Sequence, residues 1–163
     1  MKIVYPFLFL LFATQIATAQ TDERKGQILI ETEYNTFGGL LGGGSGISLV
    51  SSGGSSLTSI GVDGGYFVSK DLALLLRFSL LSADGTSLTT IGSGVKYYLI
   101  GSIPISAEFG LLSGGGGSLF TYGINAGYAI RLADNIALEP FAGVAFIEGS
   151  SSFQGGIRFA LFL

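Results

Sequence analysis

The residues of this chain that are most able to do chemistry are charged, and they lie inside segments that alternate apolar with small or polar residues. They are five acids and three bases: Glu31, Glu33, Asp63, Arg77, Lys96, Glu108, Glu139 and Arg158. Successive strand side chains point to opposite faces, so Glu31 and Glu33 share a face and are candidates for acid–base chemistry. An unpaired buried ion costs several kcal/mol, which favours ion pairing instead. We therefore interpret the eight as a structural charge network in which the three bases neutralise subsets of the acids.

The sequence excludes most other catalytic centres. It contains no His and no Cys, which removes a Ser–His–Asp triad, a thiol nucleophile and a His metal site. The glycine-rich stretch 38–46 lacks the Gly-Lys-Ser/Thr that a phosphate-binding loop requires. A formal net charge of −3 gives no basic surface for nucleic acid. We predict a protein that is not an enzyme, with no catalytic residues, no cofactor, no metal and no nucleic-acid partner.

Composition and the N-terminus indicate export to a membrane. The chain is 48% hydrophobic and only 12% charged, with a mean hydropathy of +0.60, yet after residue 20 no apolar run approaches the roughly 20 residues of a membrane helix. Lys2, the apolar stretch 3–12 and Ala17-Thr18-Ala19 have the order of a secretory signal peptide. A single membrane anchor is the alternative. We predict a signal peptide at 1–19 and one domain at 20–163, with neither a lipid anchor nor disulfides because Cys is absent.

The elements that must position the charges are strands. Period-two alternation predicts eight of them, at 27–37, 57–68, 72–81, 87–99, 104–112, 119–130, 136–147 and 153–163. Their connections alternate between Gly/Ser/Thr-rich stretches at 38–56, 82–86, 113–118 and 148–152 and tight turns at 69–71, 100–103 and 131–135. The longest connection, 38–56, is either an external loop or an extension of the two strands beside it. This pattern is typical of repeated antiparallel hairpins.

Side-chain parity divides every predicted strand into two tracks. One is apolar throughout and places Tyr66, Tyr97 and Tyr128 a few residues before tight turns. The other carries all eight charges, separated by glycines that leave room for them. A soluble barrel or sandwich would turn the apolar face inward, and a membrane barrel turns it to lipid. We favour lipid because the charged face is sparse, and we expect the three tyrosines at the membrane interface.

A family resemblance follows from these residues. The hairpin Gly65-Tyr66-Phe67-Val68 into Lys70-Asp71-Leu72-Ala73-Leu74, and a final strand over 156–163, resemble the small outer-membrane-protein β-barrel domains of Gram-negative bacteria, of OmpX and OmpA-barrel type. The resemblance implies an all-β, eight-stranded antiparallel up-and-down transmembrane barrel with both termini in the periplasm. It also implies outer-membrane lipid and, during insertion, the barrel assembly machinery as partners of a monomer. One departure is the C-terminus, because the family usually ends on an aromatic residue and this chain ends on Leu163, with Phe162 on the inward parity.

The role predicted for such a barrel is structural, or an interaction within the cell envelope. One alternative is a narrow ion or small-solute pore lined by the excess acids. Another is a secreted soluble β-barrel that binds an apolar ligand. The connection at 38–56 is the best candidate for an external contact, because the remaining connections are short or poor in aromatic and charged residues.

Overall fold

The computed structural model describes residues 24–37, 46–52, 55–83 and 86–163. The described strands are β1 (Ile28–Phe37), β2 (Gly46–Ser52), β3 (Ser55–Phe67), β4 (Leu72–Ala83), β5 (Thr86–Leu99), β6 (Ile103–Gly114), β7 (Gly117–Gly127), β8 (Ile130–Ala133), β9 (Ile136–Ile147) and β10 (Ser150–Phe162). Within these ranges, no helix is long and apolar enough to cross a membrane.

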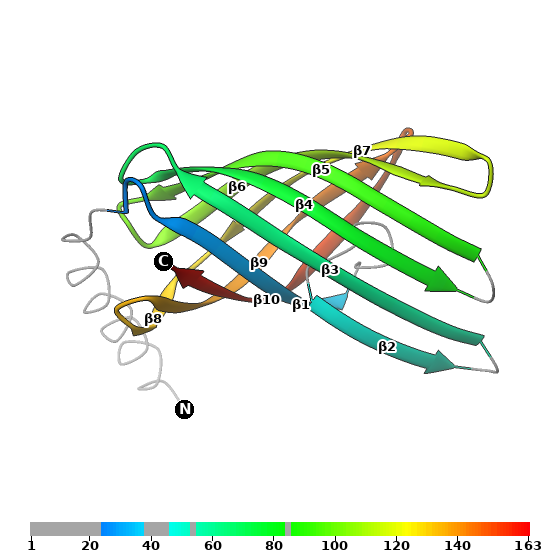
Figure 1. Cartoon of the computed structure of the whole chain (residues 1–163), viewed down its shortest axis with the longest axis horizontal. Coiled ribbons are helices and arrows are strands. Elements are labelled where there is room, and N and C mark those ends of the chain that lie inside the picture. Colours follow the sequence, from blue (N-terminus) through cyan, green and yellow to red (C-terminus); the bar gives the residue numbers. More distant parts are fainter. Residues whose placement is uncertain (1–23, 38–45, 53–54, 84–85) are drawn as a thin grey trace, which may run out of the picture.

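The strands close into a barrel, seen from the side in Figure 1. Neighbours follow the order β1, β10, β9, β7, β6, β5, β4, β3, and β1 closes the ring by pairing with β3 from Ile28 opposite Tyr66 to Glu31 opposite Asp63. Every pairing is antiparallel, and β7 and β8 both pair with β9, so together they fill one position in the wall. The predicted eight-stranded antiparallel up-and-down barrel is confirmed. Closure gives each of the eight strands in this ring two partners, which lipid requires because it cannot bond a free backbone group.

The two ends of the barrel differ in their connections. We call the end that carries Ile28 and Leu163 the terminal end; there the backbones of these two residues exchange hydrogen bonds of 2.7 and 2.9 Å. The opposite end, which carries the tips of the β2–β3, β4–β5, β6–β7 and β9–β10 hairpins, is the hairpin end. In Figure 1 the terminal end lies on the left and the longest hairpins reach to the right.

The Gly/Ser-rich connections are shorter than their composition indicates. The predicted connection 148–152 reduces to the turn Glu148-Gly149, with φ of 40° and 83°, and the connection 113–118 to Gly115-Gly116, with φ of 59° and 90°. Two consecutive positive φ angles are the requirement of a type I′ two-residue hairpin turn, which the three glycines meet without strain. The remaining Gly and Ser residues therefore continue the strands.

For the connection 38–56, the described residues favour the second alternative, an extension of the neighbouring strands, over an external loop. Residues 46–52 form β2, which pairs with β3 from Gly46 opposite Gly61 to Ser52 opposite Ser55. Residues 38–45 lie outside the described part of the chain. The turn predicted at 131–135 is shorter in the structure. Residues 131–133 belong to β8 (Ile130–Ala133), and only residues 134 and 135 form the turn.

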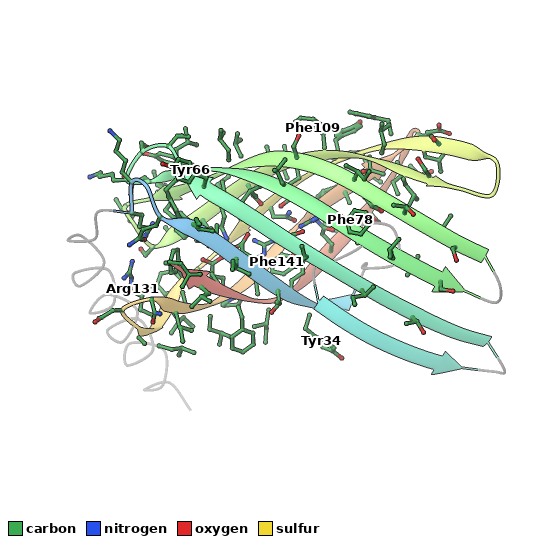
Figure 2. All side chains as sticks on the ribbon, in the orientation of Figure 1. Tyr34, Tyr66, Phe78, Phe109, Arg131 and Phe141 are labelled. Atoms are coloured by element: carbon green, nitrogen blue, oxygen red, sulfur yellow. The ribbon has the colours of Figure 1, made fainter. Side chains whose placement is uncertain are left out.

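The outer face of the barrel is apolar. Side chains such as Leu76 and Phe153 are 71% and 77% exposed, and Figure 2 shows Tyr34, Phe78 and Phe109 projecting from the wall. Along the strands that the structure describes, no outward-facing position carries a charge. Tyr66 and Tyr97 are exposed at the terminal end. Tyr128 is only partly exposed, because it lies at the break between β7 and β8, where its N–H donates to the carbonyl of Pro140.

Candidate functional site

All eight predicted charged residues point into the barrel, where their side chains form one connected set of ion pairs. We call this set the lumen network: Glu31, Glu33, Asp63, Arg77, Lys96, Glu108, Glu139 and Arg158. The strands β1, β3, β4, β5, β6, β9 and β10 each contribute to it. Residues up to 127 positions apart in the chain meet because the sheet closes on itself.

The part of the network nearest the terminal end is built around Lys96. Its ammonium group, fully buried, pairs with Glu31 of β1 and lies 2.5 Å from Oε2 of Glu139 of β9. The hydroxyl of Tyr98 donates to Oε1 of Glu139 at 2.8 Å. Lys96 and Tyr98 are two residues apart on β5, so both point inward. Two carboxylates and one ammonium here share a site from which water is excluded.

Arg158 connects this part of the network to the rest. On β10 it stands in register between Glu33 of β1 and Glu139 of β9. Its Nη2 donates to Glu33 Oε2 at 2.8 Å and lies 3.9 Å from Glu108, while its Nε lies 3.9 Å from Glu31. The guanidinium carbon also lies 4.7 Å from the ring centre of Phe141, an inward aromatic residue. A planar cation with five donors suits a position among several carboxylates.

Arg77 completes the network toward the hairpin end. It pairs in register with Asp63 of β3 and binds both carboxylate oxygens of that residue at 2.5 to 3.0 Å. Its Nη1 lies 2.7 Å from Glu108 Oε2, and its Nη2 lies 3.8 Å from Glu33. The side chains of Arg77 and Glu108 remain 17% and 14% exposed. This part of the network therefore contacts water, whereas Lys96 does not.

Glycines in the wall provide the space that these long side chains fill. Gly94 of β5 lies opposite Glu108, and a Cβ built there would lie 2.6 Å from the carbonyl oxygen of Ala107 and 3.0 Å from Cγ of Glu108. A real Cβ cannot approach a backbone oxygen that closely. The absence of a side chain at Gly94 therefore lets β6 and the Glu108 side chain lie close against β5.

Beyond Arg77 the interior opens into a chamber. It has a volume of about 50 Å³, enough for a few water molecules, and its lining includes Asp63, Arg77, Thr90, Glu108, Thr121 and Gln154. The side-chain amide of Gln154 on β10 also donates to the side-chain oxygen of Asn125 on β7 at 2.5 Å. A chamber of this size, with charged groups on its floor, has room for a few water molecules.

The sequence did not indicate a cluster of four buried side chains at the terminal end, although it gave one of them, Phe162, the inward parity. Phe67, Tyr98 and Phe162 are buried with ring centres 5.8 to 6.2 Å apart, and they close the barrel below Lys96. Arg24, also buried, lies against all three rings. The alternation carries a signal for the rings, because Phe67 and Tyr98 directly follow the outward-facing Tyr66 and Tyr97. Arg24 precedes the first strand, so no periodicity indicates it.

The geometry supports ion pairing more than catalysis. Glu31 and Glu33, the candidates for acid–base chemistry, each contact a buried cation: Lys96 and Arg158 respectively. Both carboxylates lie inside the wall and away from the chamber lining. Among the described residues, no group of three or more His, Cys, Asp or Glu is placed to hold a metal ion.

Comparison with known proteins gives the fold. No family model and no curated protein matches the sequence. The outer membrane protein Ail of Yersinia pestis, solved in a phospholipid bilayer nanodisc, is 12% identical with a TM-score of 0.55, over 85% of this chain and all of that one. The N-terminal β-barrel domain of Pseudomonas aeruginosa OprF is 15% identical with a TM-score of 0.53, over 85% of this chain and 98% of that one.

A designed protein has the same architecture. A de novo transmembrane β-barrel is 16% identical with a TM-score of 0.50, over 88% of this chain and all of that one. A fold that can be designed without a natural activity does not by itself define one. The chain thus has the fold of the outer-membrane β-barrels, and its task must be argued from the interior.

Proposed function

We propose that this protein is a non-enzymatic barrel of the bacterial outer membrane whose role is structural, or an interaction within the cell envelope, and whose lumen is closed. The observation that carries the proposal is the lumen network: eight ionic side chains join seven strands across the interior, beside a chamber with room for a few waters. In an eight-stranded barrel the interior is just wide enough for side chains to fill.

The apolar outer face supports the membrane location. Exposed Leu, Ile, Val and Phe side chains surround the barrel. A protein in water rarely exposes so large an apolar area. The terminal end would face the periplasm and the hairpin end the exterior, with outer-membrane lipid around the wall. We further propose that the chain inserts as a monomer with the help of the barrel assembly machinery, after removal of residues 1–19.

The location is tested by fractionation. The protein should remain with the outer membrane, and its unheated form should migrate differently from the heated form on a denaturing gel. A chain that stays soluble in the periplasm without detergent would contradict the membrane location and favour the soluble, ligand-binding alternative.

A narrow cation pore is the second candidate, and the chamber favours it. The carboxylates of Asp63 and Glu108 line this space, and the network contains five acids against three bases. Planar-bilayer recordings of the purified, folded protein distinguish the two functions. A closed lumen predicts no conductance steps above the baseline current. Stable and reproducible steps that a heat-unfolded sample lacks would show that ions pass through the lumen.

The interaction role has its own test. Residues 46–52 form β2 at the hairpin end, and their deletion tests this role. If the deletion variant still inserts but loses partner capture or adhesion by whole cells, the hairpin end is the contact surface. Unchanged capture and adhesion would leave the structural role.

A further inference from the structure

Arg24 is buried at the terminal end although it precedes the barrel wall. It stands four positions before β1, and only 1% of it is exposed. Its guanidinium carbon lies 4.2 Å from the ring centre of Tyr98, 5.5 Å from Phe162 and 5.8 Å from Phe67. Its Nη2 donates to the carbonyl oxygen of Gly101 at 2.6 Å. These partners come from β3, β5, β10 and the β5–β6 turn, so one side chain contacts three strands and one turn of the mouth.

The backbone before β1 is shaped to direct Arg24 inward. The N–H of Gln27 donates to the carbonyl of Arg24, and the N–H of Gly26 donates to the carbonyl of Phe67, each at 2.9 Å. Gly26 has a φ of 89°, which a residue with a Cβ rarely adopts. Lys25, the adjacent residue, is exposed. The turn thus selects one of two neighbouring cations and leaves the other in water.

The contacts around Arg24 are those of a cation-binding cage. Aromatic ring faces attract a cation through their quadrupole, and a guanidinium is planar and weakly hydrated, so it stacks on rings more readily than an ammonium. The Gly101 carbonyl adds one directional acceptor. Lys96 lies 5.1 Å from the ring centre of Tyr98, so the same ring contacts both Arg24 and the lumen network.

We propose that the terminal mouth is a guanidinium-binding site, formed by Phe67, Tyr98, Phe162 and the Gly101 carbonyl, which Arg24 occupies as a tethered ligand. Occupancy by Arg24 keeps the mouth closed to small solutes from that end. Without Arg24, the cage accepts a free guanidinium ion from solution. The proposal concerns the mouth alone and does not depend on whether the lumen network conducts ions.

Cysteine accessibility tests it, because the chain contains no Cys. Ser102 follows Gly101 and is 1% exposed, so Ser102→Cys in the folded full-length protein places a thiol just inside the mouth. A charged, water-soluble maleimide should label it slowly. Adding Arg24→Ala should raise the labelling rate about tenfold or more, because a buried thiol reacts only through local opening. Adding Lys25→Ala instead should leave the rate unchanged.

A second probe separates local opening from general loosening. Thr90 is buried on the chamber side of the barrel, so Thr90→Cys should label at the same rate with and without Arg24→Ala. An increase of equal size at both thiols would overturn the proposal, because Arg24 would then act on global stability alone.

Rescue by the ligand is the decisive measurement. Guanidinium chloride at sub-denaturing concentration should slow labelling of the Arg24→Ala, Ser102→Cys protein toward the rate of Ser102→Cys alone, and sodium chloride at the same ionic strength should not. Equal effects of the two salts would overturn the site. If Arg24→Ala does not fold, as judged by heat-dependent migration, Arg24→Lys replaces it: an intermediate labelling rate supports the cage, and a rate equal to that with Arg24 contradicts it.

Discussion

The two halves of the lumen use the same kind of residue in different surroundings. In the terminal half, Lys96 and its two carboxylate partners lie above a base of three aromatic rings and are closed off from water. In the hairpin half, Arg77 and its partners form the floor of a chamber with room for water. Removing a charge from the dry half leaves its partners unsolvated, whereas in the wet half water replaces part of what is lost.

We expect an ion pair's contribution to stability to depend on its burial in the barrel more than on its donor–acceptor distance. The Arg77–Asp63 contact is bidentate and the Lys96–Glu139 contact is not, yet the second is the more buried. Tyr98 joins the dry half to the mouth, since one ring contacts Arg24, Lys96 and Glu139. We therefore expect graded effects of substitution along the barrel axis.

The largest effect is expected at Lys96. Lys96→Met retains most of the side-chain volume but leaves the carboxylates of Glu31 and Glu139 buried without their cation, which should lower the free energy of unfolding by about 3 to 5 kcal/mol. Urea unfolding in detergent micelles measures it. Adding Glu31→Gln and Glu139→Gln should restore part of the loss, because the stranded charges are then gone. No recovery would mean that packing, and not charge, accounts for the effect.

A smaller effect is expected in the wet half. Arg77→Leu removes the partner of Asp63 and Glu108, but water in the chamber solvates these acids, so the loss should be about 1 to 3 kcal/mol. Lys70→Leu is the matched control, since its side chain is 69% exposed beside Asp71 at the terminal end. Unfolding midpoints that shift equally for Arg77→Leu and Lys70→Leu would contradict the inward position of Arg77. A loss at Arg77 larger than at Lys96 would reverse the comparison.

Packing in the wall between the halves should respond to a single methyl group. Gly94→Ala places a Cβ against the carbonyl of Ala107 and should cost about 1 to 2 kcal/mol through displacement of β6 or Glu108. Gly64→Ala on β3 is the control, because nothing lies within 4 Å of a Cβ built there. The same unfolding assay compares the two, and equal midpoints would show that β5 and β6 can separate without loss.

The smallest effect, and the only gain, is expected at the β5–β6 turn. Ile100 is a β-branched residue with a φ of 46°, a conformation that is strained for its side chain. Its side chain is half exposed, so Ile100→Gly relieves strain with little loss of burial and should raise the free energy of unfolding by about 0.5 kcal/mol. Leu99→Gly, at the last residue of β5, should lower the free energy of unfolding. A loss of stability at Ile100 would show that its side chain supports the mouth.

The sequence predicted a large part of this architecture because a strand's side-chain period is two. The opposite parities of Tyr97 and Lys96 follow from alternation alone, as does the inward parity of Phe162 at the end of β10. Composition misled where glycine and serine were interpreted as loops. In β2, and on either side of the β6–β7 turn, glycines and serines continue the strand pairing. Main-chain hydrogen bonds and a two-residue turn do not depend on large side chains.

By itself, then, the sequence determined the barrel, the face that each of the eight network residues takes and the absence of the residue types that most catalysis needs. Only the tertiary structure decided which charges meet. Lys96 and Glu31 are 65 residues apart and share a site because β1 and β5 lie across a narrow lumen. The depth of each pair, the chamber and the place of Arg24 among three rings depend on closure as well. Periodicity acts along one strand, whereas ion pairing and burial depend on distances across the barrel, and these exist only once the sheet has closed.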